Sequence, residues 1–187
     1  MPGLRVIGGE AKGRKLRQVP GGSTRPVSDR VKEALFNILN PDIGGSAFMD
    51  LFAGTGSVGI EAISRGAALA AFLDTNPRAI RTIETNLEHT GFLERAAVMR
   101  RDAFVYLSQA PPQRFDYAYV APPQYKDLWH KAVLQLDTDP DVLNPDAWVI
   151  AQIHPKEYLQ LEMKHLVEFD KRRYGSTELI FYELAGT

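Results

Sequence analysis

The 187-residue chain contains no cysteine. This absence excludes a disulfide framework, a zinc–thiolate site and a catalytic thiol. Histidine is scarce as well, and the four present show no ligand spacing such as a helical i, i+4 pair. We therefore expect no bound metal.

Long hydrophobic runs are also lacking. The longest, Ala67–Leu73, is far shorter than a membrane span. Charged residues interrupt the first part of the chain, where a signal peptide would need an apolar core. We therefore expect a cytoplasmic protein with no membrane partner. The apolar fraction of 44% and the charged fraction of 24% are typical of a globular domain with a real core.

A formal net charge of −1 conceals an uneven distribution of charge. Residues 1–32 contain eight basic and two acidic residues, a net +6, so the remainder carries −7. A basic end on an acidic body predicts a surface that binds a polyanion. The alternative is a solvated basic tail. Alternation of basic and apolar residues, with turn residues between, favours a folded binding segment.

From residue 47 onward the pattern alternates between apolar runs and amphipathic stretches, which predicts alternating strands and helices. Expected strands cover 47–51, 69–73, 97–99, 117–120 and 148–153, and expected helices cover 56–65, 77–90, 103–107 and 125–136. Segments 166–173 and 177–182 flank Gly175-Ser176 and predict an antiparallel hairpin that closes the sheet. This alternation predicts an α/β fold, an open, doubly wound and mostly parallel sheet.

A small basic unit precedes that sheet. Residues 4–7 and 13–19 predict a β-hairpin or two loose strands, followed by a helix that Ser28 or Asp29 caps and Asn40-Pro41 ends. We therefore expect a basic N-terminal extension over residues 1–40 and the main domain over 41–187.

A glycine-rich loop, Asp50–Gly59, follows the first strand of the main domain and opens a helix. Glycines let the backbone turn sharply beside a ligand, and the helix N-terminus carries partial positive charge. Asp74 lies twenty residues after Gly54, where a carboxylate can bind both ribose hydroxyls of an adenosine. The spacing fits NAD, and a tight turn without a ligand is the structural alternative.

Asp50 favours a different adenosine ligand. A carboxylate at the end of the first strand would face an ammonium group and would repel a pyrophosphate. Since the chain also has no second domain for a hydride acceptor, we predict S-adenosylmethionine (SAM) as the cofactor. Asp102, after the third strand, would hold the adenine edge together with the backbone N–H of Ala103. Its structural alternative is a plain cap of the next helix.

The expected fourth strand runs into Pro122-Pro123, which stop it because proline cannot donate to a sheet ladder. At this point the sequence resembles the RsmD family of 16S ribosomal RNA guanine-N2 methyltransferases over almost its whole length. The matching segments are Arg5–Gly9, Gly13–Leu16, Arg25–Pro26, Asp29–Asn37, Asp50–Gly56 and Arg173–Thr177. The stretch from Arg25 to Asn37 is the most family-specific, whereas many SAM-dependent methyltransferases share the glycine loop.

The resemblance implies a Rossmann-like, seven-stranded mixed sheet, with one antiparallel strand inserted near the edge. It also implies binding to ribosomal RNA or the small ribosomal subunit, and we expect a monomer. Combined with the loops above, it predicts cofactor contacts from Asp50, Phe52, Gly54, Gly56, Asp74, Thr75, Asp102 and Ala103, and a catalytic base pocket from Pro122, Pro123, Gln124 and Tyr125. RNA contacts are expected from Arg5, Lys12, Arg14, Lys15, Arg17, Arg25 and Arg30, within a basic segment that runs to Lys32.

One position departs from the family. The fourth-strand loop of RsmD-like enzymes reads Asp-Pro-Pro-Tyr, with Asn in place of Asp in related amino-methyltransferases, and here Ala121 replaces the acid. That acid or amide and a proline carbonyl accept the two amine hydrogens, while the aromatic ring stacks on the extruded base. Here the Pro122 carbonyl and the Gln124 amide oxygen would accept them, and Tyr125 would stack in a loop shifted by one residue.

Three other interpretations stay open. The first is a non-catalytic relative that binds SAM and RNA, the second an NAD-dependent oxidoreductase, and the third an enzyme that methylates DNA or another nucleic-acid base.

Overall fold

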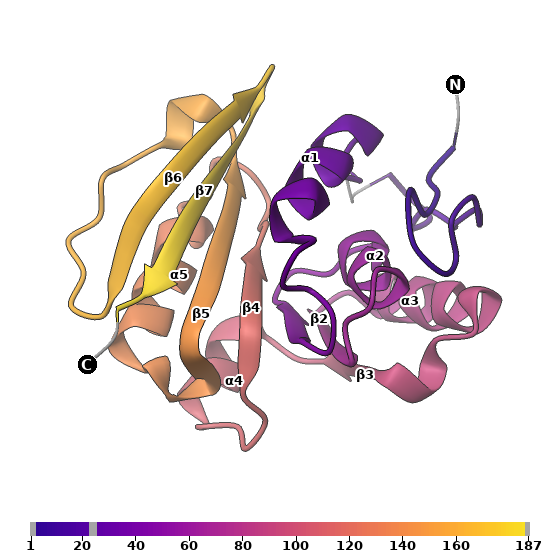
Figure 1. Ribbon diagram of the computed structural model, residues 1–187, viewed down its shortest axis with the longest axis horizontal. Coiled ribbons are helices and arrows are strands. Elements are labelled where there is room, and N and C mark those ends of the chain that lie inside the picture. Colours follow the sequence, from indigo (N-terminus) through magenta and orange to yellow (C-terminus); the bar gives the residue numbers. More distant parts are fainter. Residues whose placement is uncertain (1–2, 23–25, 186–187) are drawn as a thin grey trace. The chain divides into compact units, whose positions relative to one another are not determined.

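The structure, a computed structural model, describes residues 3–22 and 26–185 (Figure 1). Seven strands form one mixed sheet in the order β3-β2-β1-β4-β5-β7-β6. The chain divides into two compact units, Met1–Arg101 and Asp102–Thr187. The predicted α/β class and strand number are thereby confirmed.

The first unit contains three parallel strands with their helices. Its elements are α1 (Asp29–Leu39), β1 (Ala47–Asp50), α2 (Ser57–Ser64), β2 (Leu69–Asp74), α3 (Pro77–Thr90), the 3-10 turn η1 (Leu93–Arg95) and β3 (Ala96–Arg100). Strand β2 pairs in parallel with both β1 and β3. The predicted cap of the first helix is confirmed, since the side chain of Ser28 caps α1. Asn76 caps α3 in the same way, and Gly91 ends α3 in a left-handed conformation.

The second unit contains the antiparallel part of the sheet. Its elements are α4 (Ala103–Ser108), β4 (Phe115–Val120), α5 (Leu128–Thr138), η2 (Pro140–Val142), β5 (Leu143–Ile153), η3 (Pro155–Glu157), β6 (Leu166–Tyr174) and β7 (Thr177–Leu184). Strand β5 is parallel to β4, whereas β7 is antiparallel to both β5 and β6. The predicted hairpin is confirmed, and Figure 1 shows β6 and β7 as its long arms.

Two predicted boundaries in this unit are wrong, for local reasons. Helix α5 begins at Leu128 rather than at Tyr125, because Tyr125 and Asp127 adopt φ values of 63° and 56° that a right-handed helix cannot contain. Strand β5 begins five residues earlier than predicted. The turn-like sequence around Pro145 and Asp146 concealed this start, and the pairing with β4 shifts register there.

The N-terminal segment, residues 3–19, packs against the rest of the first unit. Its expected hairpin consists of one antiparallel bridge, Arg5 with Lys15, flanked by a hydrogen bond from the Leu16 N–H to the Leu4 carbonyl at 2.8 Å. Apolar side chains along it are buried, including Leu4, Val6, Leu16 and Val19. In Figure 1 this segment, in dark indigo, lies beside α2 and α3. The boundary between the two compact units falls after Arg101. The division into an extension over residues 1–40 and a main domain over residues 41–187 stays a prediction.

No helix among the described residues has the length and apolar character needed to cross a bilayer. Over the same residues, no three His, Cys, Asp or Glu side chains cluster in a way that would hold a metal ion.

Candidate active site

The glycine loop connects β1 to α2. Gly54 and Gly56 have φ values of 56° and 82°, which favour glycine. A Cβ on Gly56, the N-cap of α2, would also lie only 3.2 Å from a side-chain carbon of Ile83 on α3. A Cβ on Gly59 would meet the Phe72 ring at 2.3 Å, so this glycine permits α2 to pack on β2. The loop is therefore specified by backbone conformation and by close packing together.

Asp74 anchors this loop to the end of β2. Its Oδ2 accepts the Gly54 N–H at 2.9 Å, and its Oδ1 accepts the Asn76 N–H at 2.9 Å. The predicted neighbours Asp74 and Gly54 are thus brought into direct contact. Thr75 follows on the surface, and Phe52 is half-buried within the loop.

Asp50 lies beneath the loop and is 1% exposed. Burial, and to a smaller extent the charge of Asp74, raises the pKa of its carboxyl to about 8, and the hydrogen bond from the Phe52 N–H opposes this shift. Within residues 3–22 and 26–185, neither Asp50 nor Asp74 forms an ion pair. A ligand with a cationic group would favour the ionised form of the Asp50 carboxyl, whereas a pyrophosphate would not, so the two acids together suit a cationic ligand.

In the second unit, Asp102 and Ala103 lie at the start of α4. The Asp102 Oδ1 accepts the N–H groups of Phe104 and Val105 at 2.9 and 3.0 Å, so this residue caps α4. The structural alternative for Asp102 is therefore confirmed, and the adenine contact stays a prediction. Asp102 is exposed and Ala103 is buried.

The fourth-strand loop follows β4. Pro122 is buried, whereas Pro123, Gln124 and Tyr125 are exposed, the last by 63%. The backbone N–H of Tyr125 donates to Glu157 Oε1 at 2.7 Å, and its ring centroid lies 5.7 Å from that of His154. The loop thus presents an open aromatic face, next to which a planar base can stack.

The predicted RNA contacts lie mainly on the surface. Those exposed among the described residues are Arg5, Lys12, Arg14, Lys15, Arg17 and Arg30. Arg5 also forms an ion pair with Asp29 at 3.1 Å. Arg25 lies outside the described residues.

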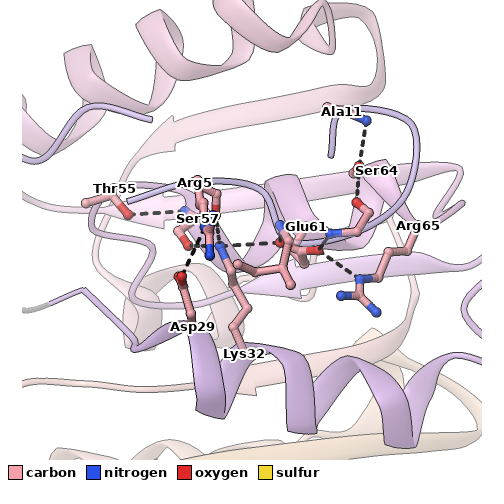
Figure 2. Close-up of polar contacts among 11 residues, drawn as sticks. Arg5, Ala11, Asp29, Lys32, Thr55, Ser57, Glu61, Ser64 and Arg65 are labelled. Atoms are coloured by element: carbon pink, nitrogen blue, oxygen red, sulfur yellow. Dashed lines mark hydrogen bonds and ion pairs between the residues drawn. The ribbon is translucent and has the colours of Figure 1, made fainter. Parts of the chain in front are cut away.

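Lys32, counted in the basic segment, is not on the surface. Its ammonium group is fully buried, donates to the Arg5 carbonyl and the Ser57 hydroxyl, and lies 3.3 Å from the Glu61 carboxylate (Figure 2). Burial lowers the pKa of Lys32, and Glu61 opposes this shift. The prediction that the basic surface extends to Lys32 is therefore wrong, because an internal carboxylate compensates this charge.

Sequence reasoning did not identify Glu61, which occupies the centre of Figure 2. Its fully buried carboxylate accepts the N–H groups of Ile7 and Gly8, both at 2.9 Å, and the Arg65 Nε at 2.8 Å. It thereby binds the N-terminal segment to α2. A signal was present, because Glu61 is the only charged residue of this buried helix.

Asn86 on α3 was also missed. It is 1% exposed; its Oδ1 accepts the Arg17 N–H at 2.7 Å, and its Nδ2 donates to the carbonyls of Arg17 and Thr55 at 3.0 and 2.9 Å. One carboxamide therefore links the basic segment to the glycine loop. No pattern in the sequence distinguished this asparagine from an ordinary polar helix residue.

The strand order and the glycine loop define the class, the α/β fold of SAM-dependent methyltransferases. Two solved structures share it over almost their full length. An Escherichia coli structure, titled provisionally as the methyltransferase yhhF, superposes with a TM-score of 0.84 at 28% identity and covers 97% of both chains. A Haemophilus influenzae structure, titled provisionally as the methylase HI0767, superposes with a TM-score of 0.81 at 30% identity. The match covers 98% of this chain and 99% of that one.

The chain belongs to the family described as Conserved hypothetical protein 95, whose model matches residues 4–183. A Bacillus subtilis protein whose name provisionally makes it an rRNA methyltransferase, YlbH, is 38% identical over 185 residues, 98% of this chain and 100% of its own. The Haemophilus influenzae Ribosomal RNA small subunit methyltransferase D is 35% identical over 151 residues, 80% of this chain and 78% of its own. The resemblance to the RsmD family is thereby confirmed.

Proposed function

We propose that the protein transfers the methyl group of SAM to an exocyclic amine of a guanine in small-subunit ribosomal RNA. The names of its relatives and its family membership support this activity. The observation that carries it is the buried Asp50 beneath a glycine loop that Asp74 holds in place.

Cofactor binding follows from the character of these groups. Asp50 would receive the ammonium group of the methionine part, and Asp74 the ribose hydroxyls. Gly54 and Gly56 allow the backbone to approach the ligand closely. The further cofactor contacts proposed are Phe52, Thr75, Asp102 and Ala103. An NAD-dependent reaction is disfavoured, because its pyrophosphate would lie beside Asp50 and Asp74, neither of which can offer it a positive charge.

SAM, when bound, would supply an activated methyl group on its sulfonium for transfer to the amine nitrogen. The chain's part is orientation, since the amine lone pair is delocalised into the guanine ring. The Pro122 carbonyl and the Gln124 amide oxygen would accept the amine hydrogens, while Tyr125 stacks on the base.

Single-turnover methyl transfer to small-subunit ribosomal RNA tests this proposal. We expect the wild type to be active despite Ala121, because orientation supplies roughly 7–11 kcal/mol, whereas general-base assistance adds about 10²–10⁴-fold. Ala121→Asp should then raise kcat and Gln124→Ala should lower it, both with little change in SAM affinity.

Two further measurements separate the alternatives. If Ala121→Asp transfers the methyl group and the wild type does not, the wild-type protein is a relative that only binds. If transfer to duplex DNA is preferred over transfer to ribosomal RNA, the protein is a DNA methyltransferase. Calorimetry should show SAM binding without NAD binding.

Asp74→Ala should weaken SAM binding at least about tenfold, because the variant cannot form the charge-assisted hydrogen bonds to the ribose.

A further inference from the structure

The loop after β4 contains backbone conformations that need support. Tyr125 and Asp127 have φ values of 63° and 56°, which residues with a Cβ adopt rarely. Such conformations persist where the surrounding structure holds them, and they cluster at functional sites. Tyr125 therefore requires a group that holds it in this loop.

Glu157, at the end of η3, makes the holding contacts. Its Oε1 accepts the Tyr125 N–H at 2.7 Å, and its Oε2 accepts the His154 N–H at 3.0 Å. The rings of Tyr125 and His154 lie 5.7 Å apart with an interplanar angle of 38°. One carboxylate therefore fixes the backbone of both residues of this ring pair.

Capping of η3 does not account for both bonds. The capping box formed by His154 and Glu157 uses only Oε2 of the carboxylate. The bond from Tyr125 to Oε1 spans 32 residues of sequence and adds nothing to the cap. Among the residues that the structure describes, Glu157 has no ion-pair partner, so its charge serves these two N–H groups.

We propose that Glu157 is a positioning residue for the methyl-acceptor nucleotide. It holds Tyr125, a residue 63% exposed, in its left-handed conformation beside His154, so that an unstacked purine of the RNA can pack on the tyrosine ring. The proposal rests on the proposed function and assigns Glu157 to binding of the substrate nucleotide.

The test is a double-mutant cycle between Glu157 and Tyr125. Glutamine keeps one acceptor oxygen for two N–H groups, so Glu157→Gln should raise both the KM and the dissociation constant for the ribosomal RNA substrate by roughly two- to tenfold. Affinity for SAM should not change. In a Tyr125→Ala background, Glu157→Gln should have no further effect, because the ring that it positions is gone. Glu162→Gln, the same chemical change at an exposed glutamate, should match the wild type.

Each outcome decides one point. If Glu157→Gln binds RNA as tightly as the wild type, the positioning role is wrong. If Glu157→Gln loses the same affinity in the wild-type and Tyr125→Ala backgrounds, the positioning role is also wrong, and Glu157 has a structural role instead. Absence of methyl transfer by the wild type would refute the proposed function. The binding cycle would still decide the role of Glu157, because it does not depend on turnover.

Discussion

The buried Asp50 carboxyl, which is proposed to bind the ligand, also lowers the stability of the folded protein when it ionises. The folded protein holds this carboxyl in a buried position where its pKa rises to about 8, far above the value of about 3.9 in an unfolded chain. Between these values the folded state binds a proton that the unfolded state lacks. The free energy of unfolding must therefore fall as pH rises through this range, and it levels off above the folded pKa.

Asp50→Asn should remove this dependence. The amide is nearly the same size and cannot ionise, so the variant should gain stability relative to the wild type between about pH 5 and 8, by at most about 1.4 kcal/mol per pH unit. Urea unfolding of the ligand-free proteins at several pH values measures the difference. Parallel pH curves for the two proteins would show that the Asp50 carboxyl is not perturbed. The same variant should bind SAM more weakly, since the amide carries no charge.

At the scale of elements, the exposed part of the basic segment has a testable role. Arg14, Lys15 and Arg17 are exposed, while the apolar residues between and around them anchor the backbone. Replacing all three by alanine should weaken RNA binding and reduce the slope of log affinity against log salt by roughly 0.7–0.9 for each phosphate that the segment no longer neutralises. SAM affinity should not change.

Filter binding or fluorescence anisotropy at several salt concentrations measures this slope. Lys12→Ala, which removes a single basic side chain from the same segment, provides a graded control with a smaller change in slope. An unchanged slope in the triple variant would mean that these side chains are only solvated.

The bounds of helices and strands could be predicted from the sequence where nearby residues determine them. The bounds of α3 follow from Asn76, Pro77 and Gly91, and the meeting of Asp74 with Gly54 follows from two adjacent parallel strands. The start of α5 was not predictable, because the left-handed conformation of Tyr125 depends on a carboxylate 32 residues away. The role of Asn86 was hidden for the same reason, since its partners are backbone groups distant in sequence. The charge of Glu61 marked it as unusual, but the backbone groups that it binds are distant in sequence as well.

For the whole molecule, the N-terminal segment completes the first unit. Without residues 1–19, Glu61 would lose two backbone donors, Lys32 would lose a carbonyl acceptor, and Asn86 would lose both of its hydrogen bonds to Arg17. Each buried polar group left unpaired costs about 1–3 kcal/mol, against a typical total stability of about 5–15 kcal/mol. A chain that begins at Pro20 should therefore fail to fold or should lose SAM binding.

Circular dichroism, thermal unfolding and SAM calorimetry measure this outcome. The Arg14, Lys15 and Arg17 triple variant is the matched control, because it removes charge and keeps the backbone in place. A shortened chain with wild-type stability and SAM affinity would instead show that residues 1–19 are separable from the rest of the chain.

Asn86 also limits how this protein can evolve. One carboxamide serves Arg17 and Thr55 together, and aspartate in its place would lack both donors and bury a charge. A substitution that altered the path of the basic segment here would also disturb the glycine loop. The basic segment and the glycine loop therefore depend on the same residue. A related protein with a different nucleic-acid target should differ in the exposed side chains of the basic segment and should keep this asparagine.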